Sequence, residues 1–298
     1  MKITLTGASG FVGSRVLAKL LADGHQAHVL GRKHDPALPM GVAFSQWDAT
    51  AEPDPASLAD ADAVIHLAGE PVGQRWTTEV KTRIRESRVR GTTLLVSALR
   101  KLSRRPAVLV AASGIGIYGP RGDEVLTETS APGQGFLAEV SRNWEAAALS
   151  AETAGIRVSC LRFGVVLGKG GALAKMLPPF RLGVGGRISS GHQWMSWIHL
   201  EDVVQMIGFA LENGAVRGAV NTTAPNPVTN RQFTEDLAGA LHRPAIFPVP
   251  EAALKLLFGE MSSLLLDSQR VLPKAANAAG FRFQYPHLRP ALVQILNS

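Results

Sequence analysis

The 298-residue sequence has little cysteine, little tyrosine and no long apolar run, and each shortage excludes a class of protein. Its single cysteine, Cys160, cannot form an internal disulfide, and the apolar residues around it predict a buried structural thiol. No stretch of about 18 apolar residues occurs, so we expect no membrane-spanning helix. Hydrophobic residues make up 46% of the chain and charged residues 18%, which argues against disorder. We therefore expect a globular protein.

Two further patterns are missing. The chain opens directly on a predicted strand, residues 2–5, with no charged segment and apolar core of a signal peptide, so the cytosol is the expected compartment. The eight histidines and the single cysteine show no ligand spacing such as HExxH, so we expect no metal site. We interpret His66, which lies inside an apolar strand, as a core histidine with satisfied hydrogen bonds.

The formal net charge of +7 raises the question of a nucleic-acid partner. The densest basic group lies on one predicted helix and comprises Lys81, Arg83, Arg85, Arg88 and Arg90. This group lacks the interleaved aromatic residues of a single-strand binder. We therefore expect no nucleic-acid binding, and a solvated helix face with one or two arginines toward an anionic small molecule explains the charge.

The most informative pattern present is a glycine turn near the N-terminus. Residues 6–13 read Thr-Gly-Ala-Ser-Gly-Phe-Val-Gly, after the apolar residues 3–5 and before an amphipathic segment that ends near Gly24. The pattern predicts a strand, a tight turn and a helix. Glycines at this spacing let the backbone approach a pyrophosphate at the N-terminus of the helix, where free N–H groups point. The turn therefore predicts dinucleotide binding.

The end of the next strand distinguishes between the two nicotinamide dinucleotides. A predicted strand over residues 26–30 leads to Gly31-Arg32-Lys33. An NAD site usually has an acidic residue here for the ribose hydroxyls, whereas arginine accommodates a 2′-phosphate. Arg32, helped by Lys33, favours NADP. The alternative is two basic side chains in a solvent-facing loop.

The rest of the first half alternates strands and helices. We expect strands at 42–47, 63–67, 107–112 and 156–161, and helices at 77–102 and 137–153. This order predicts an α/β protein, a Rossmann-type doubly wound parallel sheet with a smaller C-terminal substrate lobe. Leu67 at the end of the predicted strand 63–67, and Ala68 and Gly69 just after it, are expected to line the dinucleotide.

Composition changes after Arg162, where glycine-rich turns at 168–171 and 183–186 indicate loops around a pocket or simple turns. We assign residues 1–165 to the NADP-binding domain, with 191–224 returning to it through a helix at 201–212 and a strand at 219–222. Residues 166–190 and 225–298 form the smaller lobe, in which 281–285 are predicted to be a short strand.

Several motifs in order resemble one known family. They are TGASGFVGS at 6–14, HLAGEPV at 66–72, RIRESRVRGT at 83–92, WEAAAL at 144–149, LRFGVVLGKGGAL at 161–173 and GHQWMSWIHLEDVV at 191–204, with a terminal module around 250–281. Across its whole length the chain resembles the extended short-chain dehydrogenase/reductases, in their atypical, sugar-nucleotide epimerase-like branch, the NAD-dependent epimerase/dehydratase family proteins.

The resemblance implies NADP(H) in a cleft between the two parts. Gly7, Ser9, Gly10, Phe11, Val12 and Gly13 would surround the pyrophosphate, Arg32 and Lys33 the 2′-phosphate, and Leu67, Ala68 and Gly69 would follow along the cofactor. Arg88 stands where typical members carry an asparagine, so it and Arg83 would reach the phosphates, and Val166 would lie near the nicotinamide. The resemblance also implies a small-molecule substrate, either a nucleotide sugar or a carbonyl compound. It further implies a homodimer formed through helices 79–102 and 137–153. The alternative is that the apolar faces of these helices only cover the sheet.

One expected feature of that family is missing. Members use a Tyr-x-x-x-Lys pair in which the lysine lowers the pKa of the tyrosine from its usual value near 10. Only two tyrosines are present; Gly122 follows Tyr118 at the lysine position, and Arg289 follows Tyr285. Where the pair belongs, the chain has Phe136 or Leu137 and Val140 or Ser141.

Substitutes for the missing acid are few. Ser113 matches the region of the family's catalytic serine, or else satisfies loop backbone. Tyr118 is the nearby phenol and acts either as a substitute acid or in packing a substrate loop. Glu70 and Glu145 are further proton carriers or solvated carboxylates. His199 either faces the pocket or, as we prefer, caps a helix or holds a loop.

Three hypotheses follow. The first is an NADP-dependent oxidoreductase or epimerase-like enzyme with a substituted proton donor. The second is a non-catalytic NADPH-binding regulatory or redox-sensing module. The third, which the charge pattern disfavours, is a nucleic-acid binder that uses the arginine-rich helix.

Overall fold

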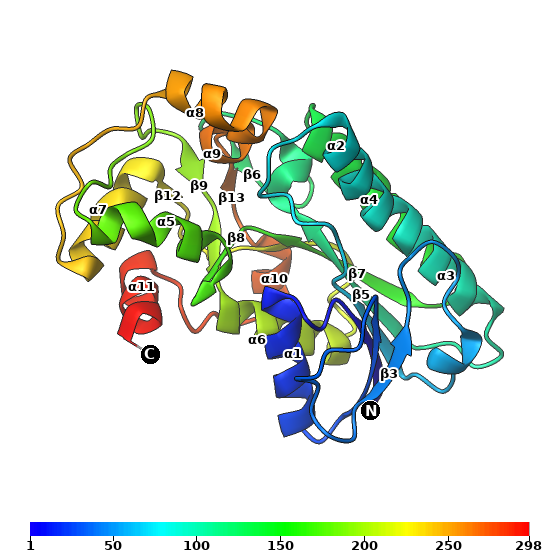
Figure 1. Ribbon diagram of the computed structural model, residues 1–298. Helices are drawn as coiled ribbons and strands as arrows, with labels where there is room; N and C mark the ends of the chain where they lie inside the picture. The colour runs from blue at the N-terminus through cyan, green and yellow to red at the C-terminus, as the bar shows by residue number, and fades with distance from the viewer. Residues whose placement is uncertain (298) are drawn as a thin grey trace.

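A seven-stranded parallel sheet forms the centre of the protein in a computed structural model that describes residues 1–297 (Figure 1). In spatial order its strands are β11 (Gly218–Thr222), β7 (Arg157–Phe163), β5 (Val108–Gly114), β4 (Ala63–His66), β1 (Lys2–Thr6), β2 (Gln26–Gly31) and β3 (Ala43–Gln46). Every pairing is parallel. From β1 the chain first adds strands on one side, β2 and β3, and then on the other side, beginning with β4. This reversal between β1 and β4 confirms the predicted doubly wound sheet and places its ligand crevice at the carboxyl ends of these two strands.

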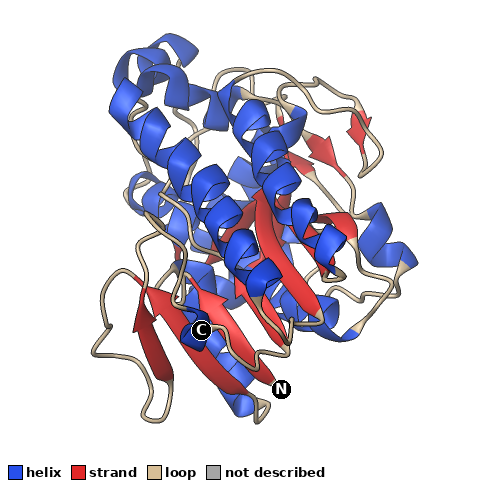
Figure 2. Ribbon diagram, turned by 90° about the vertical axis from the view of Figure 1, so that its right-hand side faces the viewer, coloured by secondary structure: helices blue, strands red, loops and turns tan. Residues whose placement is uncertain are grey.

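Helices cover both faces of this sheet (Figure 2). On one face, α1 (Phe11–Ala22) and α6 (Leu200–Glu212) bury Val16, Leu20 and Val203 against β1 and β5. On the other face, α3 (Gly91–Lys101) and α4 (Phe136–Leu149) bury Leu95 and other apolar residues. Both faces of the strands are therefore dry, which explains their nearly continuous apolar sequence.

The helix predicted over residues 77–102 contains a break. Thr77 caps α2 (Thr78–Arg85) by accepting a hydrogen bond from the Val80 amide, and α3 continues the path after a π-helical turn over Glu86–Arg90. The extent of the prediction is correct, whereas the π turn was not predicted. Such turns are frequent at functional sites, and this one contains Arg88.

A second lobe lies beside the sheet and is built largely from short helices (Figure 1). They are α5 (Gly171–Arg181), α7 (Asn230–Leu241), α8 (Glu251–Phe258), α9 (Ser263–Leu266) and α11 (Leu288–Asn297). Three two-stranded ladders pair β8 (Val165–Gly168) with β10 (Trp197–His199), β9 (Trp194–Met195) with β12 (Val228–Thr229), and β6 (Val125–Leu126) with β13 (Arg270–Val271). Trp197, which is fully buried, belongs to the lobe's own apolar core. The return of residues 218–222 to the main sheet is confirmed, while the domain boundaries stay a prediction.

The predicted strand at 281–285 is wrong. The amides of Gln284 and Tyr285 donate to the buried carboxylate of Asp202 at 2.7 and 3.0 Å, so these amides are not available for a ladder. Phe281 stacks edge-on against Phe209 and packs into the main core instead. The short helix α10 (Lys274–Ala278) precedes this segment and packs against β11.

Two sequence interpretations of single residues are confirmed. Cys160 is buried, and burial raises the pKa of its thiol. His66 lies between two threonines in the core. None of the helices in residues 1–297 has the length and apolar character needed to cross a membrane.

Candidate functional site

The glycine turn lies against the end of β4 with no space for side chains. Gly7 adopts a φ of +76°, and a Cβ on it would lie 2.8 Å from the Ala68 nitrogen and from the Leu67 carbonyl carbon. A Cβ on Gly13 would lie 2.0 Å from the Gly7 oxygen. Gly10, the N-cap of α1, supplies no side-chain cap, and the first turn contains no acidic residue. The N-terminus of α1 is thus left polar and unneutralised, which suits an anion.

A buried relay fixes the strands beneath this turn. The Ala68 amide donates to Thr6 Oγ1 at 3.2 Å, and Thr6 Oγ1 lies 2.7 Å from His66 Nδ1. His66 Nε2 in turn lies 3.0 Å from Thr92 Oγ1 on α3. Burial lowers the pKa of His66 to about 4, so the ring is neutral at pH 7. The relay connects β1, β4 and α3 at the edge where a dinucleotide is expected.

Phe11 joins the turn to the second lobe. A Cβ on Gly168, Gly170 or Gly171 would lie 2.8 to 2.9 Å from the Phe11 ring. Gly168 ends β8, the strand that contains the half-buried Val166, and Gly170 and Gly171 follow it. The glycine-rich stretch at 168–171 is therefore a seat for one aromatic ring.

Arg88 lies in the wall of the crevice. A Cβ on Gly69 would lie 3.2 Å from the Arg88 guanidinium carbon, and Arg88 Nη1 donates to the Glu70 carbonyl at 2.8 Å. On its other side the guanidinium lies 5.1 Å from the centre of the Trp144 ring. Burial lowers the pKa of Arg88 to about 10, which leaves it charged at pH 7. A half-buried cation thus lies directly beside the predicted cofactor residue Gly69.

The remaining predicted cations are exposed. Arg83 Nε donates to Glu70 Oε1 at 3.4 Å. Hydrogen bonds from Gln74 and Arg83, and the positive charges of Arg83 and Arg32, lower the pKa of Glu70. Arg32 and Lys33 are exposed at the end of β2. The structure thus places Arg32, Glu70 and Arg83 close enough to interact on one side of the crevice.

Of the two alternatives for Glu145, a proton carrier or a solvated carboxylate, the structure excludes the second. Glu145 is only 6% exposed, and it accepts hydrogen bonds from Ser113 Oγ at 2.6 Å and from Arg162 Nε and Nη2 at 2.8 and 2.7 Å. Burial alone would lower the pKa of Arg162, but its hydrogen bonds to the Glu145 carboxylate, and the negative charge of that carboxylate, raise the pKa above its ordinary value. Ser113, at the carboxyl end of β5, is therefore held by a buried ion pair.

Tyr118 belongs to the same buried network. Its hydroxyl accepts from Arg162 Nη1 at 2.8 Å and is directed at Asn221 Oδ1 at 2.7 Å and the Thr127 carbonyl at 3.0 Å. The residue is 0% exposed, and burial raises the pKa of its phenol. These contacts fit the packing alternative better than that of a substitute acid, although Tyr118 as an acid stays a prediction.

No tyrosine occupies the usual place in space either. Leu137, at the start of α4, packs on Gly116. A Cβ added to Gly116 would lie 3.2 Å from the Cβ of Leu137. Ser141, one turn later, is buried. His199 caps α6 by accepting from the Glu201 amide at 3.1 Å, which confirms the preferred interpretation of this histidine.

The basic helix is internally paired. Lys81 pairs with Glu260, Arg83 with Glu70 and Arg85 with Glu139, while Arg88 and Arg90 donate to the Glu70 and Thr50 carbonyls. This arrangement gives each cation an intramolecular partner. It is unlike a row of free cations that tracks a phosphate backbone.

Sequence reasoning did not find the Glu145–Arg162 pair. A signal was present, because a charge in the apolar strand 157–163 requires a buried partner. The identity of that partner could not be predicted from the sequence, because α4 and β7 come together only in the folded chain.

Comparison with known proteins agrees with this geometry. Residues 3–222 match the NAD dependent epimerase/dehydratase family, and residues 249–295 match a domain of unknown function, DUF1731. The Arabidopsis thaliana protein named epimerase family protein SDR39U1 homolog, chloroplastic, is 40% identical over 99% of this chain and 87% of its own length.

Many solved structures are similar to this chain, and two of them are described here. Human epimerase family protein SDR39U1 with NADPH has a TM-score of 0.90 and 34% identity, covering 100% of both chains. UDP-glucuronic acid 4-epimerase from Bacillus cereus, in complex with UDP-glucuronic acid and NAD, has a TM-score of 0.80 and 17% identity, covering 100% of this chain and 98% of its own. The second likeness concerns the fold alone.

Proposed function

Because this chain belongs to the NAD-dependent epimerase/dehydratase family, we propose that it binds NADP(H) at the carboxyl edge of its sheet. The observation that carries the proposal is the close-packed turn at Gly7 and Gly13 below an uncapped helix N-terminus, with Arg32 at the end of the neighbouring strand. The human relative's structure contains NADPH, which supports the choice of the phosphorylated dinucleotide.

Each predicted residue has a role in this proposal. The glycine turn holds the pyrophosphate through Gly7, Ser9, Gly10, Phe11, Val12 and Gly13. The 2′-phosphate is bound by Arg32 and Lys33, and positive charge is added by Arg83 and Arg88. The crevice is lined by Leu67, Ala68, Gly69 and Val166. When bound, the nicotinamide supplies hydride chemistry. The protein residues bind it, orient it and handle the proton.

For the reaction we propose oxidoreduction or epimerisation of a small hydroxyl or carbonyl compound, with Ser113 and Glu145 in place of the missing pair. The Ser113 hydrogen is directed at Glu145, so the Ser113 oxygen is free to accept a hydrogen bond from a substrate hydroxyl. As the substrate proton passes to Ser113 Oγ, the proton of Ser113 passes to Glu145. Arg162 holds the Glu145 carboxylate in place.

Turnover tests this proposal. NADP+ or NADPH is mixed with a panel of nucleotide sugars, alcohols and ketones, and nicotinamide absorbance is followed. The expected result is turnover that falls at least about 100-fold in Ser113→Ala and Glu145→Gln, because general acid–base catalysis contributes that much. Both variants should still bind NADPH. Turnover that is unchanged in both variants contradicts the relay.

The absence of a tyrosine at Leu137 and of a lysine at Ser141 favours a second candidate, a non-catalytic NADPH-binding regulatory or redox-sensing module. Pull-downs with and without NADPH test it. Partners that change with NADPH support this candidate, and identical partners together with measurable turnover refute it.

A homodimer also stays a prediction. The apolar face of α3 is buried in the core beneath it, so a dimer would pair the outer surfaces of α3 and α4, where Thr93, Arg100 and Arg142 are exposed. Light scattering on the NADPH-loaded protein measures the mass, and a monomer at all concentrations would refute the dimer.

A further inference from the structure

Two loops of the second lobe expose large apolar side chains. One loop, residues 182–189, follows α5, and the other, residues 242–250, joins α7 to α8 along the outer edge of the lobe, on the side away from β3 (Figure 1). Four side chains on these loops are between 52% and 77% exposed, and we call them the apolar patch: Leu182, Val184, Ile246 and Phe247. Side chains this exposed project from the surface and contribute little to a core.

The two loops are hydrogen-bonded side by side. The Val249 amide donates to the Arg187 carbonyl at 2.8 Å, and the Ser189 amide donates to the Val249 carbonyl at 2.9 Å. A Cβ on Gly186 would lie 1.9 Å from the Phe247 oxygen, so this close approach requires glycine. The glycine-rich turn that contains Gly186 is thus a contact site for the second loop, and it brings the apolar side chains of both loops onto one surface. Such a group of exposed apolar residues indicates an interaction site.

Prolines and the core of the lobe restrict the movement of both loops. Pro244, Pro248 and Pro250 fix the backbone φ angle at three positions of the second loop. The first loop is anchored at Gly185, where a Cβ would lie 2.7 Å from the ring of Phe180, a member of the lobe's core. Because little backbone freedom is left to lose, the apolar patch is prepared for binding.

Unpaired cations accompany the apolar patch. Arg181, Arg187 and Arg243 lie on the two loops or next to them and are exposed. Within residues 1–297 their guanidinium groups have no hydrogen-bond or ion-pair partner. The sequence contains no aspartate or glutamate at 181–189 or at 242–250. The net charge of this surface is therefore positive, so the partner that complements it is anionic.

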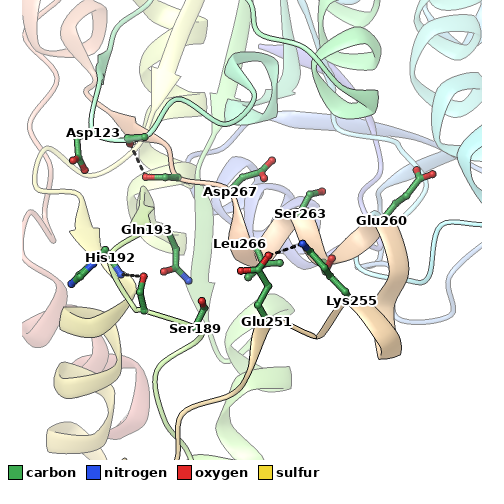
Figure 3. A pocket seen from close by; sticks show the side chains of 14 residues that line it. Asp123, Ser189, His192, Gln193, Glu251, Lys255, Glu260, Ser263, Leu266 and Asp267 are labelled. Carbon is green, nitrogen blue, oxygen red and sulfur yellow. Dashed lines mark hydrogen bonds and ion pairs between the residues drawn. The ribbon is translucent and has the colours of Figure 1, made fainter. Parts of the chain in front are cut away.

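Carboxylates gather instead in a pocket of about 520 Å³ that adjoins the end of the first loop at Ser189 (Figure 3). Four of them line this pocket: Asp123, Glu251, Glu260 and Asp267. Lys255 also lines it, but its ammonium group is paired with Glu251 at 2.6 Å, as Figure 3 shows. The pocket and the apolar patch thus have opposite charge. An anionic partner is attracted to the patch and repelled from the pocket.

We propose that the apolar patch inserts into the surface of a membrane that contains anionic lipids, with Arg181, Arg187 and Arg243 at the level of the lipid headgroups. A buried apolar area combined with a basic cluster is what holds a protein at such a surface. The proposal does not depend on the proposed function, because no residue of the dinucleotide crevice takes part in it.

The charge and the exposure of the patch disfavour other occupants. A second copy of this chain would bring the same three arginines together at a two-fold interface, where like charges repel. A folded protein needs hollows that match the projecting side chains, as the packed core of an interface does. A fluid lipid layer takes up such side chains without a preformed complement.

Co-sedimentation of the full chain with lipid vesicles tests the proposal. We expect binding to vesicles of phosphatidylcholine with about one-third phosphatidylglycerol, and binding at least about tenfold weaker to vesicles of phosphatidylcholine alone, because each arginine near an anionic surface contributes about fivefold. Added salt should weaken the binding to the anionic vesicles.

Substitutions separate the apolar from the charged contribution. The double variant Ile246→Ser with Phe247→Ser is expected to weaken binding to the anionic vesicles at least about tenfold, and Arg243→Gln about fivefold. Met40→Ser changes a fully exposed apolar residue in the loop between β2 and β3, so it is the matched control and should leave the affinity within about twofold. The melting temperature of each variant shows that a loss of binding reports the patch and not unfolding.

Fluorescence distinguishes insertion from adsorption by charge. In Phe247→Trp, lipids brominated on their acyl chains should quench more of the tryptophan emission than in the unmodified protein, and Met40→Trp should show no such gain. Absence of binding to the anionic vesicles, equal binding to both kinds of vesicle, an unchanged affinity in the double serine variant, or no added quenching in Phe247→Trp would each overturn the proposal. Displacement from the vesicles by poly-L-glutamate, with the double serine variant unaffected, would also overturn it and assign the surface to an acidic protein segment.

Discussion

Removing Glu145 is the sharpest test of the buried network. In Glu145→Ala the Arg162 guanidinium, whose side chain is only 8% exposed, loses both of its carboxylate hydrogen bonds and keeps the one to Tyr118. Removing one partner of a buried ion pair costs about 3–5 kcal/mol. In a chain of this size 1 kcal/mol lowers the melting temperature by about 2–4 °C. We therefore expect a fall of about 10 °C.

Calorimetry and urea unfolding measure this change, and Glu139→Ala on the same helix is the control. Glu139 forms an exposed pair with Arg85, and such pairs contribute about 0–1 kcal/mol. The double variant Glu145→Leu with Arg162→Met removes both charges and is expected to be more stable than Glu145→Ala. If Glu145→Ala unfolds within about 1 kcal/mol of Glu139→Ala, the pair does not stabilise the fold as reasoned.

Three further predictions concern the crevice. Arg32→Glu is expected to weaken NADPH binding at least about tenfold and NADH binding little, in fluorescence titrations; equal affinities of the unmodified protein for both would contradict the assignment. Gly13→Ala places a Cβ 2.0 Å from the Gly7 oxygen and is expected to abolish NADPH binding and lower the melting temperature, whereas Gly24→Ala, with nothing within 4 Å of its Cβ, should keep the binding. The pKa of His66 is lowered from 6.5 to about 4, so the folded protein loses stability as the pH falls below 6.5, by about 2 kcal/mol at pH 5. His66→Gln should lose this pH dependence of the free energy of unfolding, measured in urea. An equal slope of that free energy with pH in both proteins would refute the prediction.

Much of the fold was readable from the sequence, because local patterns determine it. The apolar strands of the main sheet and the glycine turn each depend on neighbours in the chain, and both were predicted. The strand predicted at 281–285 is wrong because the carboxylate of Asp202, far away in sequence, accepts hydrogen bonds from the amides of Gln284 and Tyr285. The π turn at Glu86–Arg90 was not predicted, because the apolar residues of the two flanking helices keep nearly the same spacing across it.

The candidate site was readable only in part for the same reason. Gly7 and Gly13 are recognisable by their spacing, and the structure supplies the close contacts that require them. The partner of Ser113 was not recognisable, because the contact with Glu145 depends on how α4 lies over β5. A residue type names a possible chemistry, whereas a partner in the folded chain decides whether the group is free to perform it.

The seat of Phe11 on Gly168, Gly170 and Gly171 joins the cofactor turn to the second lobe through shape alone. Contacts between a ring and glycine backbone have no net charge, so added salt does not screen them as it screens an exposed ion pair. The ion pair between Lys81 and Glu260, which joins α2 to the second lobe, is open to such screening. Raising the ionic strength therefore loosens the link at α2 and leaves the link at the dinucleotide turn in place.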